Sequence, residues 1–237
     1  MRLTKIPSAC PVIDSYCSQL VHLNYIGIHR QDDNPMKTII FVRHGESESN
    51  VAKIQANEID KYPLTARGRS QVEQLTQDLA LIRPNALYSS PVLRAAETAG
   101  IISRVLNIPV QVNPSIMERD WGRANGTVVS TFEEEVDLLL AADQYGIESI
   151  ASITKRVAEF MERLSPGVSI AVTHADVIRG ALVHAFGIND DEFSSYGIVS
   201  EKATMTVLKM SQGKFEVVAI GAPRATDTML RATGLDS

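Results

Sequence analysis

Two histidines that directly follow short apolar segments are the first residues of this chain with an evident chemical use. His44 follows residues 38–42 and is preceded by Arg43, and His174 follows residues 169–173. An imidazole can attack as a nucleophile or exchange a proton near neutral pH. A histidine at the end of a strand can equally be a structural side chain whose hydrogen bonds are satisfied. Two of them, one beside an arginine, favour chemistry without deciding it.

Arg94 is a third candidate, because it lies in the first turn of a helical pattern that follows the apolar residues 86–88. An isolated arginine in such a stretch is usually a solvated surface residue. If Arg43 and Arg94 instead converge with both histidines, the pocket is strongly cationic. Guanidinium groups bind phosphate through paired N–H donors, so a pocket of this kind is suited to a phosphoryl group.

The apolar pattern indicates the elements that must position these side chains. Short apolar runs predict strands at residues 38–42, 86–88, 110–112 and 169–173. Apolar stripes at helical spacing predict helices at residues 65–83, 91–105, 127–147, 153–164 and 176–186. Residues 204–210 and 215–220 are expected to form a terminal hairpin. This alternation predicts an α/β three-layer sandwich, in which a mostly parallel central sheet is flanked by helices.

The caps and apolar faces of these helices, and the edge of the sheet where they begin, indicate where the site lies. Thr65 is expected to be the N-cap of its helix, and Phe132, Val136 and Leu139 to form the apolar face of the surface helices at residues 127–147. A mostly parallel sheet binds ligands beyond the carboxyl ends of its strands. Both candidate histidines are expected there, where the N–H groups that begin a helix favour an anion.

Composition excludes several other classes of protein. The net charge of -5 and the pI near 5.6 argue against a nucleic-acid binder, which normally has a basic face. Cys10 and Cys17 both lie near the start of the chain, so no disulfide framework is expected and a cytoplasmic location is favoured. No apolar run is long enough to cross a membrane. The oligomeric state stays open.

The chain is expected to contain one catalytic domain at residues 36–224. Residues 1–35 end in an Asp-Asp-Asn-Pro loop signal and have no sustained period. They are interpreted either as a loosely attached extension or as an over-called start, with Met36 as the true initiator. Residues 225–237 are interpreted as a tail.

Five ordered segments resemble the histidine phosphatase superfamily, in its phosphoglycerate mutase-like branch. They are Arg-His-Gly-Glu-Ser at 43–47, Pro-Leu-Thr-Ala-Arg-Gly at 63–68, Tyr-Ser-Ser-Pro through Thr-Ala at 88–99, Met-Glu-Arg-Asp-Trp-Gly at 117–122, and Val-Thr-His at 172–174. A single Arg-His-Gly is a weak signal, whereas five matches in family order are specific. The resemblance runs from Met36 to about Gly221 and implies the fold of that branch.

The resemblance implies a metal-independent phosphoryl transfer through His44, which would attack phosphorus and become phosphohistidine. Arg43, Arg94 and His174 would hold the equatorial phosphoryl oxygens, where the charge of the transition state lies. Glu118 would protonate the leaving oxygen and then deprotonate the incoming water.

The match also implies that the Asn50 side chain and the Ala175 N–H contact the phosphate. The family usually has glycine where Ala175 stands, but a backbone donor survives that change. The next residue, Asp176, is expected to be a helix N-cap, with a carboxylate at the pocket rim as the alternative. No metal or cofactor is expected, because arginines supply the positive charge and no carboxylate cluster suited to magnesium occurs.

The acceptor of the phosphoryl group is expected to be water. Similar mutases carry a longer insertion with basic residues for the substrate carboxylate. Here residues 123–148 are short and acidic, and only Arg119 and Arg123 are candidates. This favours hydrolysis of a small phosphomonoester, with a phosphoglycerate mutase-type phosphotransferase as the alternative. A third hypothesis, a non-catalytic phosphate-binding module, would be expected to lose the nucleophile or the acid.

Overall fold

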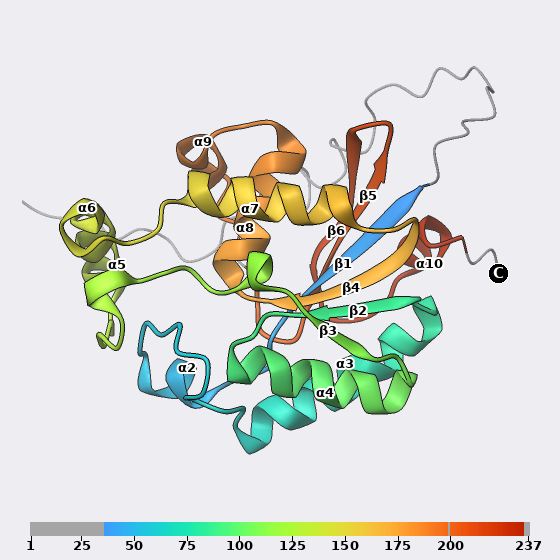
Figure 1. The fold of residues 1–237 in the computed structure, drawn as a ribbon, viewed down its shortest axis with the longest axis horizontal. Coiled ribbons are helices and arrows are strands. Elements are labelled where there is room, and N and C mark those ends of the chain that lie inside the picture. Colours follow the sequence, from blue (N-terminus) through green and yellow to red (C-terminus); the bar gives the residue numbers. More distant parts are fainter. Residues whose placement is uncertain (1–35, 199, 235–237) are drawn as a thin grey trace, which may run out of the picture. The chain divides into compact units, whose positions relative to one another are not determined.

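The structure is a computed structural model that describes residues 36–198 and 200–234 (Figure 1). At its centre lies a six-stranded sheet with the order β3-β2-β4-β1-β5-β6. The strands are β1 (Lys37–Arg43), β2 (Ala86–Ser89), β3 (Val110–Val112), β4 (Gly167–Thr173), β5 (Met205–Ser211) and β6 (Lys214–Ala222). The first four are parallel, β5 pairs antiparallel with β1, and β6 pairs antiparallel with β5. The predicted mostly parallel sheet is confirmed.

Helices cover both faces of the sheet. One face carries α3 (Ala66–Ile82), α4 (Leu93–Leu106) and α10 (Asp227–Ala232), and the other carries α7 (Ile150–Arg163) and α8 (Ala175–Phe186) (Figure 1). Successive residues of β1 enter opposite cores: Ile40 and Val42 join the first, Ile39 and Phe41 the second. Because both faces are covered, β1 is an unbroken apolar run rather than an alternating one. The predicted three-layer sandwich is confirmed.

The remaining helices are shorter. They are α2 (Glu48–Ala52), η1 (Pro114–Ile116), η2 (Gly122–Ala124), α5 (Phe132–Leu140), α6 (Ala142–Tyr145) and α9 (Asp190–Ser195). The predicted surface helices are α5 and α6, but the prediction for Phe132 is wrong: its side chain is 76% exposed. Phe132 is the first residue of α5, whereas Leu139, the residue before its last, packs against the cluster that contains Trp121.

Three other expectations concern the ends of elements. The N-cap of α8 is His174, so the prediction that Asp176 caps this helix is wrong, and Asp176 lies in the first turn. The segment interpreted as a tail contains α10, whose Met229 is fully buried. The proposed extension at residues 1–35 lies outside the described residues. Among the residues that are described, no helix is long and apolar enough to cross a membrane.

The start of α3 packs against the loop that carries His44. Thr65 caps α3 as predicted: its hydroxyl accepts from the Gly68 N–H at 2.9 Å and donates to Glu46 Oε1 at 2.8 Å. A Cβ on Gly68 would overlap the backbone of Glu46, and a Cβ on Gly45 would lie 2.6 Å from the Gly68 oxygen. The two glycines therefore let the loop and the helix approach closely.

Two glycine-to-alanine changes within helices should have opposite effects on stability. Gly68→Ala should lower the free energy of unfolding by about 1–3 kcal/mol, because the new methyl group meets backbone that cannot yield. Gly100→Ala, in α4, meets its nearest atom at 3.7 Å and should raise it by about 0.5–1 kcal/mol through helix propensity. Urea unfolding of both variants measures the difference, and equal shifts would contradict the close approach at Gly68.

Candidate active site

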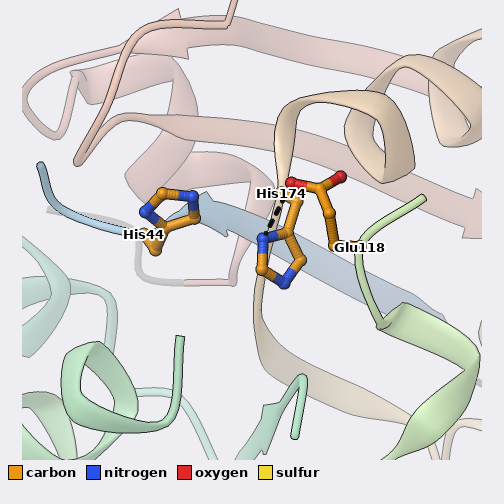
Figure 2. A group of neighbouring side chains, drawn as sticks. All are labelled: His44, Glu118 and His174. Atoms are coloured by element: carbon orange, nitrogen blue, oxygen red, sulfur yellow. Dashed lines mark ion pairs between the residues drawn. The ribbon is translucent and has the colours of Figure 1, made fainter. Parts of the chain in front are cut away.

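The pairing of β1 with β4 brings the two histidines together. In the parallel register Arg43 lies opposite Thr173, so the next residue of each strand is a histidine. The His44 N–H donates to the Thr173 carbonyl at 3.0 Å, which extends the pairing by one residue. The two imidazole rings lie 5.1 Å apart, and Figure 2 shows them beside Glu118. Both rings are buried.

The hydrogen bonds of His44 define its tautomer. Nδ1 lies 2.7 Å from the carbonyl oxygen of Gly45, which can only accept, so Nδ1 carries the proton. Nε2 is then the unprotonated nitrogen, and Arg94 Nε donates to it at 3.1 Å. Burial, and next the charge of Arg94, hold the pKa of His44 well below its usual value of 6.5. The ring is therefore neutral, with a lone pair on Nε2.

Arg94 connects the parts of the site. It is the second residue of α4, and its side chain is 3% exposed. Its Nη2 donates to the Ala56 carbonyl at 2.8 Å and to Glu118 Oε2 at 3.0 Å. Arg94 Nη1 and Arg43 Nε are buried without a hydrogen-bond partner among the described residues, while Arg43 Nη1 donates to the Ser200 carbonyl. An anion in the site would satisfy the two unpaired donors.

Glu118 and His174 form the other side of the site. His174 Nδ1 lies 3.2 Å from Glu118 Oε2, but without the alignment of a hydrogen bond. Burial alone would raise the pKa of Glu118, yet its contacts with His174 and Arg94 outweigh burial and hold the pKa well below its usual value. Burial lowers the pKa of His174 to about 4, although Glu118 opposes the shift. Near neutral pH, Glu118 is therefore ionised and His174 is neutral.

Most of these side chains line a cavity of about 340 Å³, but the fully buried His174 does not. The predicted residues that line it are Arg43, His44, Asn50, Arg94, Glu118 and Ala175. Ala175 is the first residue of α8, so its N–H has no acceptor within the helix. The Asn50 side chain accepts from the Ser47 N–H at 3.2 Å. The structure thus brings the sequence-predicted residues to one place, while their roles stay predictions.

Several residues around the site were not singled out from the sequence. Thr98 accepts from the Gly45 N–H at 3.2 Å, and Ser90 lies 2.8 Å from His174. Both fall within the matched segment at residues 88–99, but their types alone carried no signal. Lys53 and Lys202 also line the cavity, as does Glu135.

Asp176 pairs with Arg119 instead of capping a helix. Arg119 Nε lies 2.8 Å from Asp176 Oδ2, and its guanidinium stacks over Trp121 at 5.3 Å. Burial raises the pKa of Asp176 to about 6, against the opposing charge of Arg119. Arg119 is 4% exposed, and the exposed Arg123 donates to the Gln144 carbonyl. Neither arginine lines the cavity described above.

His44, Glu118 and His174 are also a possible metal-ligand set, because one ligand atom from each lies within 4.8 Å of the others. Arg94, however, already donates to both His44 Nε2 and Glu118 Oε2. A metal ion would have to displace this guanidinium and approach a second one, Arg43. The donor set therefore fits an anion better than a cation.

Comparison with known proteins shows what this chain is similar to. Residues 39–223 match the family model "Histidine phosphatase superfamily (branch 1)". A 2,3-bisphosphoglycerate-dependent phosphoglycerate mutase of Thermoplasma acidophilum is 32% identical over 82% of this chain and 96% of its own length. Phosphoserine phosphatase 1 of Hydrogenobacter thermophilus is 29% identical over 75% of this chain and 88% of its own. The solved structure of Bacillus stearothermophilus YhfR matches with a TM-score of 0.69 at 21% identity, over 81% of this chain and 99% of its own, which supports the fold alone.

The protonation of the two histidines can be tested directly. We expect His44 to stay neutral well below pH 6.5 and His174 to gain its proton near pH 4. An unfolded histidine binds a proton near pH 6.5. The unfolded state therefore binds more protons below that pH, and stability should fall as the pH falls from about 6.5. Imidazole ¹H–¹⁵N spectra across pH measure both values, and titration of His44 at or above pH 6.5 would contradict the assignment.

Proposed function

Because the chain belongs to the histidine phosphatase superfamily, we propose that it hydrolyses a small phosphomonoester through a phosphohistidine on His44. The observation that carries this proposal is the tautomer of His44. Its Nδ1–H is held by the Gly45 carbonyl, and its Nε2 lone pair faces the cavity side chain Arg94. A neutral imidazole with a free lone pair is the form that attacks phosphorus.

In the first step, His44 Nε2 attacks phosphorus and the bond to the leaving oxygen breaks. Arg94 Nε moves from His44 to a phosphoryl oxygen, and the unpaired Arg43 Nε and Arg94 Nη1 donate to the others. These donors stabilise charge that spreads over the oxygens in the transition state. The phosphoryl group is now bound to His44, and the departing oxygen of the ester takes a proton from Glu118.

For this donation Glu118 must be protonated in the substrate complex. In the free protein Arg94 and His174 keep it ionised. A bound phosphate group adds negative charge beside the carboxylate and engages Arg94, and both effects raise the pKa of Glu118. In the second step the Glu118 carboxylate takes a proton from water, the water oxygen bonds to phosphorus, and the bond to His44 breaks.

The acceptor is proposed to be water because the cavity lacks a dedicated basic cluster. Arg119 is paired with Asp176, and Arg123 donates to the backbone. Lys53 and Lys202 line the cavity, but so do Glu135 and Asp176, so its charge does not select a second anionic group.

A mutase is the second candidate function, and the similarity to the Thermoplasma acidophilum phosphoglycerate mutase favours it. A product assay with phosphoglycerates separates the two candidates: a phosphatase releases inorganic phosphate, whereas a mutase yields the isomeric ester. A non-catalytic phosphate-binding module has the least support, since the candidate nucleophile and acid are both in place.

His44→Ala should abolish hydrolysis of an aryl phosphate, with a loss of about 10³-fold or more, because the nucleophile is removed. Phosphate release is measured in the presence of EDTA, since the mechanism uses no metal. His184→Ala, which removes a histidine of α8 that packs against Phe215, is the matched control and should stay active. Substantial activity in His44→Ala would refute the nucleophile assignment.

Glu118→Gln should discriminate between leaving groups. Alkyl phosphates have poor leaving groups that need a proton, so we expect a loss of about 10²–10⁴-fold for them. Aryl phosphates should lose much less. The matched control is Glu73→Gln at an exposed position of α3, which should leave the ratio of the two rates unchanged. Equal losses on both substrates in Glu118→Gln would argue against an acid role.

A further inference from the structure

We infer that Ser90 is a positioning residue that fixes the tautomer of His174, so that Nδ1–H points to Glu118 and to the substrate phosphoryl group. Ser90 does not line the substrate cavity and has no role in the steps above. The effect of Ser90 on catalysis rests on the proposed function, whereas its effect on the tautomer of His174 does not depend on any reaction.

Ser90 is held rigidly behind His174. It lies between β2 and α4, and its side chain is fully buried. Its backbone N–H donates to the Val172 carbonyl at 2.9 Å, which ties it to β4, the strand that His174 follows. Its Oγ lies 2.8 Å from His174 Nε2 and accepts from the Val92 N–H at 3.3 Å. The hydroxyl oxygen therefore has a fixed place at the back of the imidazole.

The direction of the Ser90–His174 hydrogen bond follows from the other side of the ring. Nδ1 lies 3.2 Å from an oxygen of Glu118. Contacts with His174 and Arg94 hold the pKa of Glu118 well below its usual value, against burial, and an ionised carboxylate can only accept. Nδ1 must therefore carry the proton, because two facing lone pairs would repel.

A neutral imidazole has a single N–H, so His174 Nε2 is left with a lone pair. The Ser90 hydroxyl then donates its hydrogen to Nε2, and it can do so because the Val92 N–H supplies the donor that Ser90 itself accepts. The Val92 N–H donates to Ser90 Oγ, the Ser90 hydroxyl donates to His174 Nε2, and the proton of the ring lies on Nδ1. This assignment gives the Val92 N–H, the Ser90 hydroxyl and His174 Nε2 each a hydrogen-bond partner, and it turns Nδ1–H toward the Glu118 carboxylate.

The arrangement matters when substrate binds. Nδ1 is buried and has no aligned hydrogen-bond acceptor among the described residues, so in the proposed mechanism we expect its N–H to donate to a phosphoryl oxygen that substrate brings beside Glu118. Without the Ser90 hydroxyl, His174 can place its proton on Nε2 instead. Nδ1 would then present a lone pair instead of an N–H to a phosphoryl oxygen, and the two would repel each other.

The test compares two adjacent serines. Ser89 is also fully buried, but its hydroxyl donates to the Ser90 carbonyl at 2.8 Å rather than to a ring nitrogen. Ser90→Ala and Ser89→Ala each remove one buried hydroxyl, so the urea midpoints of both should shift downward to a similar degree. Imidazole ¹⁵N spectra of His174 then report which nitrogen carries the proton.

We expect wild type and Ser89→Ala to show His174 protonated on Nδ1 alone, and Ser90→Ala to show a mixture with the Nε2–H form. On an aryl phosphate, Ser90→Ala should lose about 10- to 100-fold in kcat/KM relative to Ser89→Ala, the scale seen when an orienting partner of a functional histidine is removed. Ser90→Cys, with a weakly donating thiol of similar shape, should fall between the two.

An unchanged His174 tautomer in Ser90→Ala, or equal kinetic losses in the two alanine variants, would overturn the inference. The spectra keep it separate from the proposed function. If the wild-type protein hydrolyses no phosphomonoester while the tautomer depends on Ser90, the proposed function fails and the role of Ser90 in setting the tautomer stands.

Discussion

The pairing of β1 with β4 is the constraint on which the site depends. Their parallel register places His44 and His174 side by side, and one further hydrogen bond, from His44 N–H to the Thr173 carbonyl, fixes their relative height. Two helices start at the same edge of the sheet: α8 follows His174 directly, and α4 supplies Arg94. A one-residue slip in this register would turn every side chain of β1 to the other face and exchange the two cores.

The site is costly to bury, and its internal contacts offset that cost. Arg94 is almost fully enclosed, yet it donates to a neutral histidine, a carbonyl and a carboxylate. Arg43 Nε and Arg94 Nη1 are buried without hydrogen-bond partners in the part of the chain that the structure describes. Unpaired buried donors of this kind cost free energy, and a bound anion that accepted from them would recover it. In the proposed mechanism, Arg94 donates to His44 Nε2 until a phosphoryl oxygen takes that hydrogen bond.

The sequence predicted the sheet and the helices on both faces, because strong apolar periods are local signals, and the residues that it singled out by ordered motifs lie close together, while their roles stay predictions. It failed where a residue's role depends on a distant partner. Aspartate is a common N-cap residue, but the Asp176 carboxylate pairs instead with Arg119, whose Nε lies 2.8 Å from Asp176 Oδ2 although it is distant in the sequence. Met229 lies in a segment with little periodicity, and only the packing of α10 against the core shows that it is buried.

The sequence by itself determined which groups are available: the ordered motifs that carry Arg43, His44, Arg94, Glu118 and His174, and the strands and helices that deliver them to one edge. Only the tertiary structure decided their protonation, their tautomers and the part played by Ser90. Those properties depend on burial and on contacts between residues 50 and 84 positions apart, as between Arg94 and His44 and between Ser90 and His174. The charge state of a group is set by the atoms around it in space, and sequence order does not record them.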